Sequence, residues 1–64
     1  MFLIKEYRKK AGLTQLQLAQ NIGITREHLS LVENGHKKPS LTTLEKIAKE
    51  LHTSIKDLID EQSA

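Results

Sequence analysis

Apolar residues recur along this chain at intervals of three and four, the spacing of one face of an α-helix. The clearest stretch runs from residue 41 to 51, where the apolar positions are Leu41, Leu44, Ile47, Ala48 and Leu51. No convincing strand pattern is present. The periodicity therefore predicts an all-α fold with five helices, at about residues 2–11, 15–22, 26–33, 41–51 and 55–61.

Residues that begin and end helices stand at the edges of these ranges. A hydroxyl precedes four of the five helices, where it can accept a hydrogen bond from a first-turn amide: Thr14, Thr25, Ser40 and Ser54. Gln17 follows Thr14 at the spacing of a capping box. Gly12 and Gly23 stand where the first two helices should stop, because glycine readily takes the positive φ of a helix C-terminus.

Composition bounds the size and class of the protein. The chain has 64 residues and no cysteine, so a single domain over residues 1–64, ending in a frayed tail at 62–64, must be held together by its core. Only Phe2 and Tyr7 are aromatic, so aliphatic side chains must fill that core. The longest apolar run, "MFLI", is too short for a membrane span or signal peptide. We therefore expect a soluble, cytoplasmic protein.

Charge is distributed unevenly along the chain. Residues 1–39 carry seven Lys and Arg against three Glu, whereas residues 40–64 carry three Lys against five Asp and Glu. A basic front and an acidic back suit a protein that presents one side to a polyanion. A mixed, solvated surface explains the same numbers equally well.

The helix predicted at 26–33 has two different faces. Leu29 and Val32 mark an inward stripe, while the opposite side carries a mixed set: Arg26, Glu27, Ser30 and Leu31. A very short turn that contains Gly23 separates this helix from the one before it, and Ala19 is small enough to let the two helices cross closely. This is the helix-turn-helix pattern, at about residues 14–33, whose second helix can lie in the DNA major groove.

Four motifs stand in order at fixed spacing: "GLTQ", "LA…IGIT", "LSLVENG" and "PSLTTLEKIA". With them the sequence resembles the Cro/C1-type (lambda-repressor-like, XRE) helix-turn-helix family over nearly the whole chain. The resemblance implies a compact five-helix bundle that binds double-stranded operator DNA as a homodimer. It implies a transcriptional regulator, a repressor or controller protein, in a bacterial or phage context and associated with the nucleoid.

Alternative functions stay open at this point. The length suits a minimal repressor, a restriction-modification controller or the N-terminal domain of a longer regulator. The same fold also serves as a protein-interaction module, such as an antitoxin, in which DNA binding is secondary or lost.

The candidate base contacts are the outward residues of helix 26–33. Arg26 can pair bidentately with guanine, and Leu31 can meet a thymine methyl group, although a lone exposed leucine needs no such role. Glu27 must accept from a cytosine amino group, orient Arg26 or point away from the phosphates. Ser30 is short and permissive.

The candidate phosphate contacts surround that helix. By resemblance, Gln15 holds a phosphate at the start of its helix, although it is also an ordinary first-turn polar residue. His28 either packs against the preceding helix or reaches a phosphate. The full candidate set is Gln15, Thr25, His28, Asn34, His36, Lys37 and Lys38.

Two further roles concern structure and assembly. Arg8 and Glu33 match the positions of a structural ion pair in family members, and the alternative for Arg8 is a phosphate contact. The candidate dimer interface consists of apolar residues near the two chain ends, which would otherwise complete the core of the monomer: Phe2, Ile55, Leu58 and Ile59.

Other chemistry is poorly supported. His28, His36 and His52 are not spaced as metal ligands, and no cysteine joins them. There is no nucleophile–base arrangement and no glycine-rich phosphate loop. We therefore expect no enzymatic activity, catalytic residue, cofactor or metal, no membrane partner and no small-molecule ligand.

Overall fold

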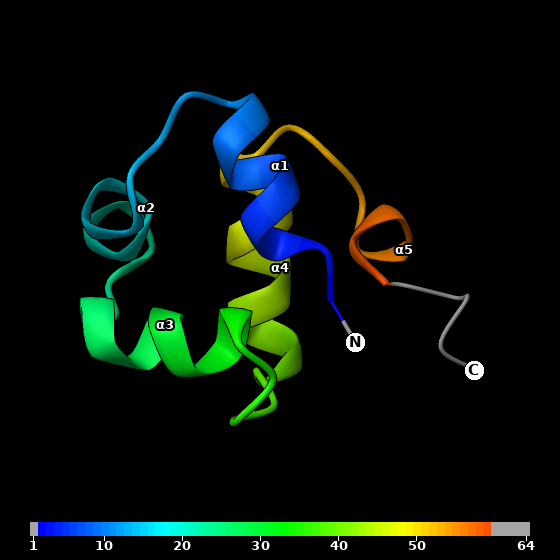
Figure 1. The fold of residues 1–64 in the computed structure, drawn as a ribbon. Coiled ribbons are helices and arrows are strands. Elements are labelled where there is room, and N and C mark those ends of the chain that lie inside the picture. Colours follow the sequence, from blue (N-terminus) through cyan, green and yellow to red (C-terminus); the bar gives the residue numbers. More distant parts are fainter. Residues whose placement is uncertain (1, 60–64) are drawn as a thin grey trace.

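The computed structural model describes residues 2–59 and contains five helices in the order that the periodicity predicts. Their bounds are α1 Ile4–Lys10, α2 Gln15–Ile22, α3 Arg26–Glu33, α4 Leu41–Glu50 and α5 Ile55–Leu58. In Figure 1, α4 stands at the centre, with α1 in front of it, α2 on one side, α5 on the other and α3 beneath. The predicted five-helix fold is confirmed over the described residues.

The predicted caps are in place at four helix starts. Thr14 and Gln17 form the full capping box: Thr14 Oγ1 accepts from the Gln17 amide at 3.0 Å, and Gln17 Oε1 accepts from the Thr14 amide at 2.9 Å. The other three hydroxyls each accept from the third amide of their own helix: Thr25, Ser40 and Ser54. Each cap satisfies an amide that has no partner within its helix.

Four helices end in the same way, with one residue at positive φ. Gly12, Gly23 and Gly35 fill this position after α1, α2 and α3, and His52 fills it after α4 with φ 54°. In each case the next amide reaches back to a carbonyl five residues earlier, as Thr53 N does to Ala48 O at 2.9 Å. His52 is therefore a non-glycine residue at a glycine-type position.

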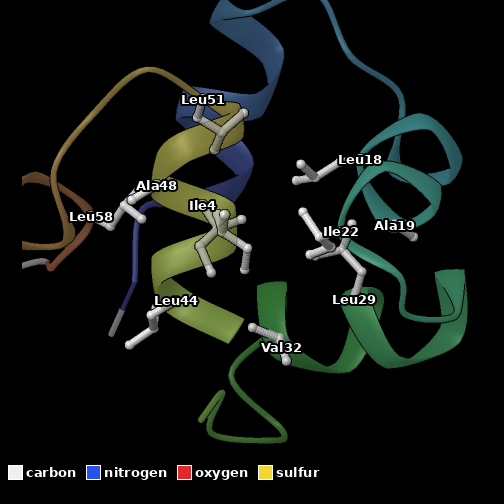
Figure 2. Packing of buried hydrophobic residues seen from close by; sticks show 11 residues of the cluster. Ile4, Leu18, Ala19, Ile22, Leu29, Val32, Leu44, Ala48, Leu51 and Leu58 are labelled. Atoms are coloured by element: carbon white, nitrogen blue, oxygen red, sulfur yellow. The ribbon is translucent and has the colours of Figure 1, made fainter. Parts of the chain in front are cut away.

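Within residues 2–59, eleven buried apolar residues form the core, and all lie in the five helices except Leu51, which directly follows α4. Figure 2 shows Leu18 and Ile22 of α2 facing Ile4 of α1 across the centre, while Leu29 and Val32 rise from α3 below them. The largest of the fully buried side chains are Ile4, Leu18, Leu29, Ile47 and Leu58. Because α3 contributes both Leu29 and Val32, its orientation is tied to the core.

The two outer helices are shorter than the sequence predicted. The first begins at Ile4 rather than 2, because the Leu3 amide donates to Leu58 O at 2.7 Å and Phe2 forms an antiparallel β-bridge with Ile59. The fifth ends at Leu58 rather than 61, because Ile59 is extended to meet that bridge. Residues 60–64, which include the tail predicted to fray at 62–64, lie outside the described part of the chain. The bridge between the chain ends has no local signal in the sequence.

Leu41 also departs from the expected pattern. It is 65% exposed at the first turn of α4, although it lies in phase with the buried residues of that helix. Helical phase places a residue on a face, but burial also requires a neighbouring element to cover that face.

Candidate nucleic-acid interface

The site is built on the relation between α2 and α3. Figure 1 shows α2 nearly end-on while α3 runs across the view, so the two helices cross steeply after a short turn. Ala19 is fully buried in α2, and its carbonyl accepts from the amides of Gly23 and Ile24 at 2.9 and 3.0 Å. Gly23 has φ 81°, a conformation that costs other residues about 1–2 kcal/mol. These residues fix the angle at which α3 leaves α2.

The outer face of α3 holds the four candidate base contacts. Leu29 and Val32 are buried, whereas the side chains of Arg26 and Glu27 are 54% and 75% exposed, and Leu31 is 45% exposed. Ser30 is only half-buried, and its hydroxyl accepts from Asn34 Nδ2 at 3.4 Å. The helix thus presents a cation, a carboxylate and an apolar side chain together on one exposed face.

Arg26 and Glu27 form an ion pair on this face. The Nη2 of Arg26 lies 3.6 Å from Oε1 of Glu27. Of the three roles open to Glu27, this contact favours the one in which it orients Arg26. Both groups are exposed to solvent, so the pair is weak and leaves Arg26 available to another acceptor.

The loop after α3 is fastened to the end of that helix. The amides of His36 and Lys37 both donate to Leu31 O, at 2.9 and 3.2 Å. The candidate phosphate contacts of the loop are all exposed: Asn34, His36, Lys37 and Lys38. The backbone bonds therefore hold a cationic loop directly beside the outer face of α3.

Arg8, Gln15 and Glu33 form one network, which joins α1, α2 and α3. Arg8 Nε donates to Glu33 Oε2 at 2.7 Å, and Arg8 Nη2 donates to Glu33 Oε1 at 3.2 Å. Gln15 Nε2 donates to the same Oε1 at 3.0 Å. The structure therefore contains the Arg8–Glu33 ion pair that the resemblance implies. It adds Gln15, a link that nothing in the sequence indicated.

The remaining candidates are placed as follows. Thr25 caps α3 by accepting from the His28 amide at 3.0 Å, and its hydroxyl proton is still free to be donated. His28 itself is half-buried. Lys10, which the charge pattern placed on the basic side, holds its ammonium 5.4 Å from the centre of the Tyr7 ring.

The candidate dimer interface needs one correction. Leu58 is fully buried within the single chain, so it belongs to the core and cannot offer surface to a second copy. Ile55 and Phe2 are half-buried and pack against the core, and Ile59 is 43% exposed. Three of the four expected residues therefore keep some accessible surface.

The described residues meet the requirements of a ligand groove, a metal site and a membrane span to different degrees. A groove of about 440 Å³ lies between the end of α2 and α4, and none of the candidate DNA contacts lines it. Within residues 2–59, no group of three or more His, Cys, Asp or Glu side chains is placed to hold a metal ion. No helix of this described part has the length and apolarity to cross a membrane.

Comparison with known proteins gives the same picture. Residues 4–58 match the helix-turn-helix family. An uncharacterized HTH-type transcriptional regulator of Methanothermobacter thermautotrophicus is 42% identical over 65 residues, covering 97% of this chain and 94% of that protein. The restriction-modification controller protein C.AhdI of Aeromonas hydrophila superposes with a TM-score of 0.82, at 32% identity, over 88% of this chain and 85% of that one.

SinR of Bacillus subtilis is a longer relative. It is 38% identical over 60 residues, so this chain spans about half of it: 92% of this chain aligns with 54% of SinR. A crystal structure of SinR in complex with DNA has a TM-score of 0.81 at 36% identity, over 89% of this chain and 92% of that one. The fold found here is thus one that has been seen bound to DNA.

Proposed function

Because this chain belongs to the Cro/C1-type helix-turn-helix family, we propose that it is a transcriptional regulator that binds double-stranded DNA sequence-specifically. The observation that carries the proposal is the exposed face of α3, where Arg26, Glu27 and Leu31 lie together. The buried apolar side chains of Leu29 and Val32 anchor the opposite face of this helix in the core. A helix of this kind fits the major groove, where each base pair presents a distinct pattern of donors and acceptors. We name α3 the recognition helix.

In this proposal the recognition helix reads bases and its surroundings hold phosphates. Arg26 donates to guanine and Leu31 contacts a thymine methyl group, while Glu27 orients Arg26 and Ser30 permits close approach. The phosphate contacts come from the candidates around the helix: Gln15, Thr25, His28, Asn34, His36, Lys37 and Lys38. Phosphate contacts fix the register of the protein on the duplex, and base contacts carry the sequence preference.

The proposed biological form is a cytoplasmic homodimer that acts as a repressor or controller on nucleoid DNA, with no catalytic role. Two recognition helices about 34–36 Å apart would match two half-sites one helical turn apart. Ile59, Ile55 and Phe2 offer the apolar surface for the second copy. Analytical ultracentrifugation of the wild type and of Ile59→Asp tests this. A dimeric wild type and a monomeric variant, with the helical circular dichroism spectrum of the variant retained, support the proposal. A wild type that stays monomeric on an operator duplex contradicts it.

The experiment that tests DNA recognition is selection of binding sites from random-sequence duplex DNA. A regulator recovers a defined sequence and binds it roughly 10³-fold or more tightly than unrelated duplex at physiological salt. Recovery of no common sequence, with weak binding to every duplex, would contradict the proposal and favour a protein-interaction module.

A further inference from the structure

Glu33 holds Gln15 in one orientation. The carboxylate of Glu33 is fully buried and meets three donors: Nε and Nη2 of Arg8, and Nε2 of Gln15. A carboxylate can only accept hydrogen bonds, so it is the amide nitrogen of Gln15 that must face it, and the amide oxygen must face elsewhere. The orientation of this amide, which an exposed glutamine would choose freely, is therefore set by a buried charge.

The bond to Glu33 leaves Gln15 with spare donor capacity. An amide nitrogen carries two N–H groups, and Glu33 takes one of them at 3.0 Å. Gln15 is the first residue of α2 and is half-buried. Its second N–H thus belongs to a side chain that is already ordered, at a helix start whose backbone dipole favours an anion.

Arg8 joins this arrangement to the chain that leads into α2. Its Nη1 donates to Leu13 O at 2.8 Å, two residues before Gln15, while its Nε and Nη2 hold Glu33 at the end of α3. The start of α2 and the end of α3 are therefore fixed to the same guanidinium group.

We propose that Glu33 is a positioning residue for DNA binding: it accepts one N–H of Gln15 so that the second N–H donates to a DNA phosphate. The proposal rests on the proposed function. It gives the buried network two tasks, since the same carboxylate that pairs with Arg8 also orders the phosphate contact. Because Gln15 is ordered before DNA arrives, little side-chain entropy is lost on binding.

A double-mutant cycle on the full chain tests this proposal. Gln15→Met removes the donor, and the pair Arg8→Met/Glu33→Leu replaces the buried ion pair with apolar groups, a change that buried pairs often tolerate. The probe is the duplex recovered by selection from random DNA. In the wild-type background, Gln15→Met should weaken binding about threefold to tenfold, the range of one hydrogen bond. In the Arg8→Met/Glu33→Leu background it should weaken binding less than twofold.

The controls separate positioning from general damage. Gln20→Met makes the same change at an exposed glutamine of the same helix and should leave affinity unchanged. Gln15→Met should also leave the salt dependence of binding unchanged, because a neutral side chain releases no counterion. An equal loss for Gln15→Met in both backgrounds overturns the positioning role. No loss in either background overturns the phosphate contact, while the wild type still binding its duplex leaves the proposed function standing.

A second measurement uses only the wild type and serves if the doubly substituted chain fails to fold. The side-chain amide protons of Gln15 are followed by NMR, with assignment from their absence in Gln15→Met. The proton donated to Glu33 should be protected from exchange both in the free protein and on DNA. The second proton should be protected only on DNA. Two freely exchanging protons in the free protein, or loss of the Glu33-bound protection on DNA, would overturn it.

Discussion

The Nε of Arg8 in α1 donates to Oε2 of Glu33 at the end of α3 over 2.7 Å, and both side chains are almost wholly buried. The two residues are 25 positions apart, so the pair ties the N-terminal helix to the recognition helix. A buried ion pair is conditional in its effect: it stabilises the fold only while both partners are present, because either one alone is an unpaired buried charge.

Removing only one partner of the Arg8–Glu33 pair should therefore destabilise the fold strongly. Arg8→Met should lower the free energy of unfolding by about 3–5 kcal/mol, whereas Arg8→Met/Glu33→Leu should lower it much less. A chain of this length has only about 3–10 kcal/mol in total, so the single variant should be close to unfolding. Urea denaturation of the wild type and both variants measures the difference. Equal destabilisation of the single and double variants would mean that the charge left unpaired is not the cause.

The four helix ends provide a matched test of backbone strain. His52→Gly should stabilise the chain by up to about 1 kcal/mol, because glycine adopts φ 54° without crowding of a Cβ atom. Gly23→Ala should destabilise it by about 1–2 kcal/mol through the backbone alone, since a Cβ there would meet no atom within 4 Å. Thermal unfolding of both variants checks the opposite signs. Destabilisation by His52→Gly would show that the imidazole makes a contribution larger than the strain.

Lys38 in the loop after α3 should strengthen DNA binding through its charge, without discriminating between base sequences. Lys38→Ala should weaken binding to every duplex alike and reduce the slope of log affinity against log salt by about one unit. Lys49→Ala, an exposed lysine of α4 beside the groove, is the matched control and should leave the slope unchanged. The slope is measured by titration at several salt concentrations. A Lys38→Ala slope equal to that of the wild type would remove this residue from the phosphate contacts.

Glu27 should restrain Arg26 and repel phosphates. Glu27→Gln removes the ion pair seen at 3.6 Å, so it should raise affinity for unrelated duplex by about 0.3–1 kcal/mol and broaden the preference for the selected site. Competition between the selected duplex and unrelated duplex measures both effects. A sharp loss of affinity confined to one cytosine-containing position would instead assign Glu27 a direct base contact.

Local chemistry made much of the fold predictable. Four helices begin at a hydroxyl residue, because the hydroxyl accepts a hydrogen bond from a first-turn amide: Thr14, Thr25, Ser40 and Ser54. The two partners of each bond lie within four residues in the sequence. Gly12 and Gly23 end helices for a reason that is equally local. The inner and outer faces of α3 also follow from helical period alone, which predicts a buried Leu29 and an exposed Leu31, as the structure has them.

Contacts between distant residues were not predictable in the same way. The bridge between Phe2 and Ile59 shortened the first and last helices, and no local pattern announces a pairing of the two chain ends. The bond from Gln15 to Glu33 spans 18 positions and depends on how α2 and α3 cross. Leu41 has the helical phase of a buried residue, but no neighbouring element packs over it and it is exposed. In the candidate site, the sequence thus indicated residue identities and three possible roles for Glu27; the structure supplied the orientation of Gln15 and showed Glu27 beside Arg26.

The most direct test of the central claim, that α3 reads base sequence, is the base preference of Arg26→Ala compared with that of the wild type by selection from random duplex DNA. Arg26→Ala should lose about 1–3 kcal/mol of binding free energy at one base position and its symmetry mate, with the other positions and the salt dependence nearly unchanged. A uniform loss across all sequences would contradict this claim, because Arg26 would then be holding phosphate and not reading a base.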